Sequence, residues 1–165
     1  MGRKMGKQNE LEVVNIRMVK EPSLYSEDKI TCPEDAVKVI AKELATYDRE
    51  VFAVLNLKTN GQPINFNICS VGTLDASLVS PANVVKSGIL TNAAAQIVCH
   101  VHPSGSLTPS QEDMDVTKRL IASSELLGIR LLDHIIISGG TGDVFSFKNA
   151  GLLDQLTPRQ KVWER

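Results

Sequence analysis

Residues 99–113, CHVHPSGSLTPSQED, bring together side chains that can do chemistry. His100 and His102 are separated by one residue, and Ser110 follows after a further seven. Asp113 comes three residues after Ser110. Imidazole nitrogens and carboxylate oxygens are common zinc ligands, and catalytic zinc sites use three protein ligands and leave the fourth position to water. The spacing therefore predicts a metal site formed by His100, His102 and Asp113.

The two histidines are expected near the end of a β-strand, AQIVCHVH at residues 95–102. Side chains of a strand alternate between its two faces, so His100 and His102 point the same way and can reach one metal ion. Cys99 and Val101 point the other way, and we expect Cys99 to lie in the core.

Asp113 is expected in the first turn of a helix that begins at Ser110, where a carboxylate can point back towards the end of the strand. The same Ser-x-x-Asp pattern is also a capping box, in which the serine only caps the helix. A single histidine on a strand is most often a packed structural residue. The combination of these residues at these spacings favours the metal site, and Ser110 can cap the helix in either case.

Hydrophobic periodicity and turn residues predict the element order β-α-β-β-α-β-α-β-β. Strands are expected at residues 11–20, 50–58, 63–72, 95–102, 129–138 and 144–149, and helices at residues 31–47, 80–92 and 110–127. The pair Asn60-Gly61 predicts a hairpin between the second and third strands. Thr31 and Glu34 have the spacing of a capping box for the first helix, with Pro33 in its first turn. This order predicts an α/β fold in which helices flank a mixed β-sheet.

The composition is that of a soluble globular protein. The chain has 165 residues, of which 42% are hydrophobic and 22% charged, and this length suits one domain with its own core. The net charge is -1, which weighs against a protein whose main role is to neutralise nucleic-acid phosphates. No apolar run is long enough to cross a membrane. Cys32, Cys69 and Cys99 are odd in number and widely spaced, which suits a reducing compartment, so we expect a cytoplasmic protein.

The spacing His-x-His-x7-Ser-x2-Asp matches the motif of the JAMM (MPN+) metalloproteases. The segments HVHPSGSLTPSQED, LTNAAAQIVCH and LLDHIIIS, the last followed by FSF, resemble the RadC branch of that superfamily over about residues 30–153. The resemblance implies one RadC-like JAB/MPN domain, similar in fold to the cytidine deaminases, at residues 11–153. Residues 1–10 are then expected to form a flexible N-terminal tail, and residues 154–165 a C-terminal tail.

The resemblance also implies an activity, the zinc-dependent hydrolysis of amide or isopeptide bonds, and therefore a peptide or isopeptide-type substrate. One zinc ion per chain would be bound by His100, His102 and Asp113. Ser110 would help to stabilise the oxyanion that develops during the reaction.

The general base of the family is a glutamate early in the domain. Its match here is Glu50, in the segment YDREVFAVLNL, and Asp48 is the alternative. A carboxylate close to the zinc-bound water can accept a proton and later pass it to the leaving amine. His134, in LLDHIII, is expected to pack or to make a polar contact at a strand end, with a role beside the metal or the substrate as the alternative.

Two features depart from the RadC pattern. Many relatives have Asn between the two histidines, where this chain has Val101, but strand alternation turns this position away from the metal. Full-length RadC proteins usually carry an N-terminal helix-hairpin-helix region that binds DNA, and the 30 residues before the region of resemblance are too few to form one. This weakens the expectation of a DNA role.

Two other functions are weighed against the hydrolase. The first is a non-catalytic or accessory module linked to DNA repair or mobile elements, with a structural or vestigial metal. The intact ligand set favours the hydrolase over this module. The second is a two-metal phosphoesterase or nuclease, which needs many more ligands, while His134 is the only histidine left over. The sequence leaves open the natural substrate and the oligomeric state.

Overall fold

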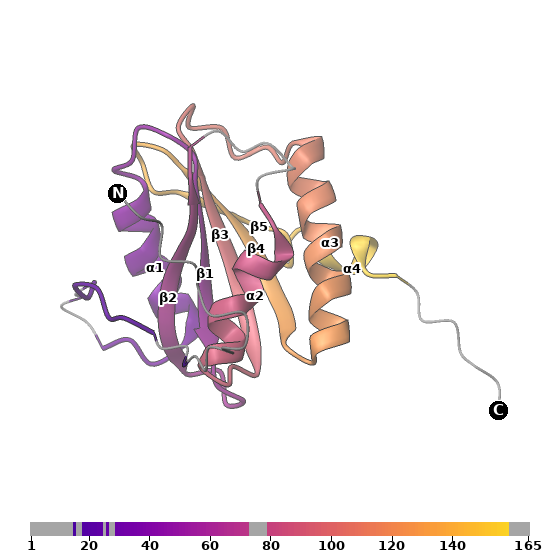
Figure 1. Ribbon diagram of the computed structural model, residues 1–165. Coiled ribbons are helices and arrows are strands. Elements are labelled where there is room, and N and C mark those ends of the chain that lie inside the picture. The colour runs from indigo at the N-terminus through magenta and orange to yellow at the C-terminus, as the bar shows by residue number, and fades with distance from the viewer. Residues whose placement is uncertain (1–14, 16–17, 25, 27–28, 73–78, 159–165) are drawn as a thin grey trace, which may run out of the picture.

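A mixed five-stranded β-sheet, in the strand order β2-β1-β3-β4-β5, forms the centre of the computed structural model (Figure 1). The structure describes residues 15, 18–24, 26, 29–72 and 79–158. The strands are β1 (Val51–Leu57), β2 (Pro63–Val71), β3 (Ala95–His102), β4 (Arg130–Ser138) and β5 (Val144–Ser146). Strands β3 and β4 are parallel, and the other neighbouring pairs are antiparallel. The predicted α/β fold, a single domain with helices flanking a mixed sheet, is confirmed.

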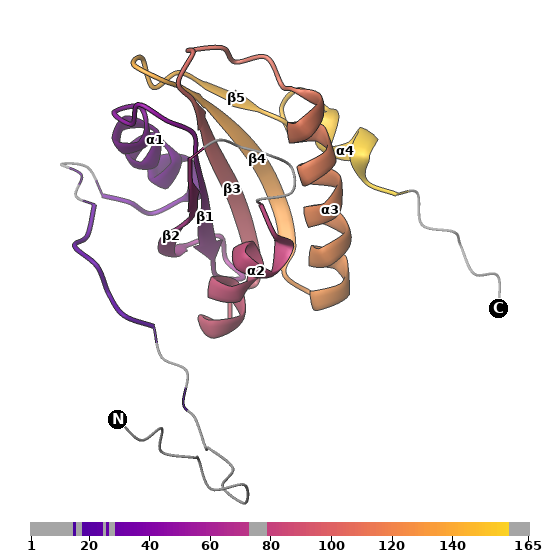
Figure 2. The same ribbon diagram turned by 45° about the horizontal axis from the view of Figure 1, so that its top comes forward.

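In the described part of the chain four helices flank this sheet, and the alternation of strand side chains assigns them to its two faces. They are α1 (Pro33–Leu44), α2 (Pro81–Leu90), α3 (Gln111–Leu127) and α4 (Leu152–Leu156). On one face Leu55, Cys99 and the apolar side of α1 form one buried cluster. On the other face Phe52 and Val98 pack with residues of α2 and α3. Figure 2 shows α1 and α3 on opposite sides of the sheet.

The hairpin predicted at Asn60-Gly61 is confirmed by the antiparallel pairing of β1 with β2. Gly61 has a φ of 81°, a value that glycine adopts without steric cost. The backbone N–H of Lys58 donates to the carbonyl of Gln62 at 2.9 Å, which closes the turn. The hairpin makes β2 an edge strand, so that β1 and β3 lie inside the sheet and carry its most buried residues.

The start of α1 differs from the prediction by one residue. Its N-cap is Cys32 and its capping carboxylate belongs to Asp35, whereas the sequence pattern pointed to Thr31 and Glu34. Pro33 explains the shift, because proline favours the first helical position and so makes the preceding residue the cap. Thr31 still donates its N–H and its hydroxyl to the same Asp35 carboxylate, both at 3.1 Å.

The described residues near the two ends of the chain differ in places from the prediction. In the strand predicted at residues 11–20, the described residues 15 and 18–20 are not in a strand, and the others lie outside the described residues. Residues 1–10 and 159–165 also lie outside them. At the C-terminal end, α4 runs past residue 153, where the sequence placed the end of the domain, and Leu153 is buried. β5 stops at Ser146, three residues before the end of the strand predicted there.

Candidate metal centre

Strand β3 positions both histidines at its C-terminal end, on the face that is covered by α2 and α3. Their Nε2 atoms face each other at 2.7 Å. His100 is completely buried, and His102 is the last residue of the strand. The predicted alternation is confirmed, because Cys99 and Val101 lie in the core on the opposite face.

Helix α3 brings the third candidate ligand to the same point. The loop after β3 arches over the edge of the sheet and ends at Ser110, the N-cap of α3 (Figure 1). The Ser110 hydroxyl accepts a hydrogen bond from the N–H of Asp113 at 3.1 Å, and the Ser110 N–H donates to Asp113 Oδ2 at 2.7 Å. The capping box is therefore formed, and it aims the Asp113 carboxylate at the two histidines.

The side chains of His100, His102 and Asp113 form a compact group with more hydrogen-bond acceptors than donors. Asp113 Oδ1 lies 3.1 Å from His100 Nε2, and Oδ2 lies 3.4 Å from His102 Nε2. One candidate ligand atom from each residue lies within 4.8 Å of the others. In the described part of the chain, Asp113 Oδ1 is the buried side-chain polar atom without a hydrogen-bond partner. A buried carboxylate oxygen in that state is costly unless a cation binds it.

The contact made by His102 Nδ1 indicates which ring nitrogen of His102 carries the proton. His102 Nδ1 is 2.9 Å from the carbonyl oxygen of Ser106, which can only accept a hydrogen bond. A neutral His102 therefore carries its proton on Nδ1 and presents the lone pair of Nε2 to the group. Metal-binding histidines are held in this way, with the second ring nitrogen donating to a carbonyl or carboxylate.

The electrostatics of the group favour positive charge at this point. Burial acts to raise the pKa of Asp113, but the neighbouring His100 and His102, together with the N–H of Ser110, outweigh burial and hold that pKa well below the usual range. The hydrogen bond with Asp113 raises the pKa of His102. The ionised Asp113 carboxylate and the raised pKa of His102 both indicate a site that stabilises positive charge, which a bound metal ion can supply.

His134 contacts a candidate ligand, the arrangement that the sequence offered as its alternative role beside the metal. Its Nε2 lies 2.8 Å from His100 Nδ1, and its Nδ1 lies 2.5 Å from Thr117 Oγ1. Burial, followed by the charge of His100, lowers the pKa of His134 well below its usual range, so its ring is neutral. Thr117 was missed by sequence reasoning, although it lies four residues after Asp113 and therefore on the same helical face.

Gly139, at the end of β4, was also missed. A Cβ atom there would lie 2.9 Å from the carbonyl oxygen of His102 and 2.9 Å from Cα of Pro103, so any larger residue would displace the chain. The Gly139 N–H donates to the same carbonyl at 2.9 Å. This close approach fixes the end of β3.

Glu50 immediately precedes β1, whose residue Phe52 pairs with His100. Glu50 comes two residues before Phe52, and His102 comes two residues after His100. Because the strands are antiparallel, Glu50 lies beside the end of β3 that carries His102. The Glu50 charge contributes to the raised pKa of His102, after the larger effect of Asp113. Asp48, the alternative base, is exposed and forms an ion pair with Arg49 at 2.7 Å. The geometry brings Glu50, and not Asp48, towards the candidate ligands.

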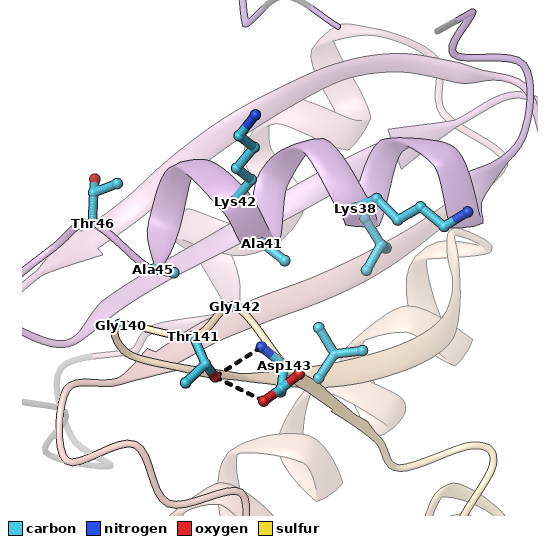
Figure 3. Close-up of a pocket in the computed structure, with 11 residues that line it drawn as sticks. Lys38, Ala41, Lys42, Ala45, Thr46, Gly140, Thr141, Gly142 and Asp143 are labelled. Carbon is cyan, nitrogen blue, oxygen red and sulfur yellow. Dashed lines mark hydrogen bonds between the residues drawn. The ribbon is translucent and has the colours of Figure 1, made fainter.

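A hollow lies on the α1 side of the sheet, between that helix and the β4–β5 turn. It has a volume of about 650 Å³. Asp143 N donates to Thr141 Oγ1 at 3.2 Å, and the Thr141 hydroxyl lies 2.9 Å from Asp143 Oδ2, so the polar groups of the turn pair with one another (Figure 3). The Lys42 side chain points away from the turn in the same view. This hollow contains none of the candidate metal ligands.

The sequence matches a known family over most of its length. Residues 30–152 match the profile of the RadC-like JAB domain. A UPF0758 protein of Clostridium acetobutylicum is 44% identical over 125 residues, which are 76% of this chain and 54% of the relative. A UPF0758 protein of Desulforamulus reducens is 44% identical over 124 residues, 75% of this chain and 54% of that protein. The chain thus spans about half the length of the curated relatives that it matches. No helix of the described residues is long and apolar enough to cross a membrane.

Proposed function

Because this chain belongs to the family of RadC-like JAB domains, we propose that it is a zinc-dependent hydrolase of amide or isopeptide-type bonds. One observation carries the proposal. His100, His102 and Asp113 converge within 4.8 Å, and Asp113 Oδ1 is buried there without a hydrogen-bond partner. A structural polar cluster would pair that oxygen, whereas a metal site leaves it for the ion.

The donor set supports one zinc ion per chain. Two imidazole nitrogens and one carboxylate oxygen are a ligand set of catalytic zinc sites, which keep a fourth position open. A two-metal phosphoesterase site would need a second group of ligands. His134 does not supply it, because its two ring nitrogens face His100 and Thr117.

Zinc at this position would supply a Lewis acid and a water molecule whose pKa is lowered to ~7. Glu50 is the proposed general base, which takes the proton of the attacking water and then gives it to the leaving amine. The proposal for Glu50 over Asp48 is supported by its place beside His102 and by the exposed ion pair that Asp48 makes with Arg49.

Ser110 is the proposed oxyanion donor. Its hydroxyl oxygen accepts from the N–H of Asp113, which uses a lone pair and leaves the hydroxyl proton for a second partner. The cap therefore holds the oxygen in place while the proton remains available to a substrate carbonyl. Loss of one such donor typically reduces kcat by about 100- to 1000-fold.

The test combines metal content with turnover on peptide and isopeptide-linked fluorogenic substrates. We expect about one zinc per chain, turnover that disappears in Glu50→Gln while zinc is kept, and loss of zinc in His102→Ala. Asp48→Asn is the matched control and should keep both properties. A stable, folded protein without metal would overturn the proposal, and full activity of Glu50→Gln would show that Glu50 is not the base.

The alternative, a non-catalytic accessory module, predicts a different result for the wild type in the same assays. In that case zinc binds, but no substrate of the panel is cleaved by the wild type. The near-neutral net charge of -1 gives no support to a main role in nucleic-acid binding. A fluorescence-anisotropy titration with duplex and single-stranded DNA measures that role directly.

A further inference from the structure

A chain of hydrogen bonds runs from the backbone of α3 to the candidate metal ligand His100. The Thr117 hydroxyl donates to the carbonyl oxygen of Asp113 at 2.6 Å. Thr117 Oγ1 also lies 2.5 Å from His134 Nδ1, and His134 Nε2 lies 2.8 Å from His100 Nδ1. All four residues are buried, so the groups of this chain depend on one another for hydrogen bonds.

The direction of the first bond determines the others. A backbone carbonyl can only accept, so the single hydroxyl proton of Thr117 is used on Asp113 and its oxygen must accept from His134. A neutral His134 with its proton on Nδ1 has only a lone pair on Nε2. That lone pair accepts the proton of His100 Nδ1, so the Nε2 atom of a neutral His100 has no proton and faces the Asp113 carboxylate.

From this geometry we infer that His134 is a positioning residue that fixes the tautomer of His100 so that Nε2 is free to bind the metal. The inference rests on the proposed zinc site and deepens it. One turn of α3 supplies both ends of the arrangement, because Asp113 provides a ligand through its side chain and anchors Thr117 through its carbonyl. The tautomer of His100 and the position of Asp113 are therefore set together.

The surroundings of His134 keep its ring in one orientation. The ring is completely buried and stacks on Phe147 with a centroid distance of 4.6 Å. Phe52 contacts it edge-on at a centroid distance of 5.7 Å. A ring held between two phenyl groups cannot turn away from His100 without opening a cavity, so the hydrogen bond to His100 is kept whether or not a metal is bound.

The first test compares two substitutions at position 134. His134→Phe keeps the stacking on Phe147 but offers no acceptor to His100. His134→Gln offers a carbonyl oxygen to His100 and an amide N–H to Thr117. We expect the zinc affinity, measured by competition with a chelator dye, to fall by about 10- to 100-fold in His134→Phe and to recover most of that loss in His134→Gln. Equal affinities in wild type and His134→Phe would overturn the inference.

The second readout is the tautomer itself, which a purely structural role of His134 would not change. The chain has three histidines, so their ring ¹⁵N signals can be assigned from single substitutions. In the metal-free wild type we expect His134 and His100 to carry their protons on Nδ1. In His134→Phe we expect His100 to move its proton to Nε2, where it can donate to Asp113. A wild-type His100 protonated on Nε2 would contradict the inference.

Two substitutions of Thr117, at the other end of the hydrogen-bond chain, keep the test decisive if His134→Phe does not fold. Thr117→Val removes the oxygen that holds the His134 proton on Nδ1, whereas Thr117→Ser keeps it. We expect weaker zinc binding and a shifted His100 tautomer in Thr117→Val alone, and unchanged values for both readouts in Thr117→Val would overturn the inference. If the wild type binds no zinc, the proposed function fails, and the tautomer of His100 in the metal-free protein still decides this inference.

Discussion

Two buried polar clusters lie on the same face of the sheet, at its opposite ends, and they differ in how their polar atoms are paired. One is the group of His100, His102 and Asp113. The other, which we call the amide cluster, consists of Asn56, Gln96 and Ser87. Residues Val54 and Val98 pair across β1 and β3 between the two clusters.

In the amide cluster the partners are all protein groups. Asn56 Nδ2 donates to Ser87 Oγ at 2.9 Å and to Asn65 Oδ1 at 2.7 Å. Gln96 Nε2 donates to Asn56 Oδ1 at 2.8 Å and to the Val84 carbonyl at 3.1 Å. Within the described residues, none of its buried side-chain atoms is without a partner, while Asp113 Oδ1 is. A buried polar cluster that pairs all its atoms stabilises a fold, and one that keeps an excess of acceptors is ready to bind a cation.

The largest expected difference between the clusters is in metal content. His102→Ala removes one of three ligands and should reduce bound zinc from about one per chain to almost none. Asn56→Leu should leave zinc content unchanged, because Asn56 has no contact with the ligands. Elemental analysis of both purified variants checks this, and equal zinc loss in the two would remove the distinction between the clusters.

The next difference is the response of stability to zinc. A ligand that binds only the folded state at 100 times its Kd raises the free energy of unfolding by about 2.7 kcal/mol. We expect this increment in the wild type and in Asn56→Leu, and none in His102→Ala. Thermal unfolding with zinc and with a chelator measures it. An increment that persists in His102→Ala would place the metal elsewhere.

A smaller effect is expected from breaking the amide cluster. Asn56→Leu leaves the buried Gln96 amide and the Ser87 hydroxyl without one of their partners, and each such group costs about 1–3 kcal/mol. The metal-free protein should therefore lose stability by that order in urea unfolding. Gln62→Leu, on the exposed hairpin, is the control and should change little. No loss in Asn56→Leu would mean that the amide cluster is not structural.

The smallest expected effect has the opposite sign. Asp113→Asn turns the orphaned oxygen into an N–H donor that can meet His100 Nε2, while its remaining oxygen keeps the bond from Ser110. A net hydrogen bond contributes about 0.5–1.5 kcal/mol, so the metal-free variant should be more stable than the metal-free wild type although it no longer binds zinc. A clear loss of stability on urea unfolding of the metal-free variant would contradict this account of the Asp113 oxygen.

Much of the candidate site could be predicted from the sequence because its signals are local. The strand alternation placed His100 and His102 together, and the capping-box spacing placed Asp113 at the start of α3. The same pattern was ambiguous between cap and ligand, and the structure shows that Ser110 and Asp113 form the cap that aims the carboxylate at the histidines.

Contacts between residues of separate elements could not be predicted from local sequence patterns. His134 lies on β4 and Thr117 on α3, and nothing in their own segments says that they meet. Gly139 is required by a neighbouring strand, a contact that no turn pattern of its own reveals. The start of α1 was placed one residue early because Thr31 and Cys32 both precede Pro33 closely, and only the proline position decides between them.

The central claim is that His100, His102 and Asp113 bind one zinc ion, and native mass spectrometry of the intact protein tests it most directly. Wild type and Asp113→Asn, purified in parallel and supplied with equal zinc, should differ by one bound ion. The account predicts one zinc in the wild type and none in Asp113→Asn. A folded wild type without zinc, or one zinc in both proteins, would contradict it.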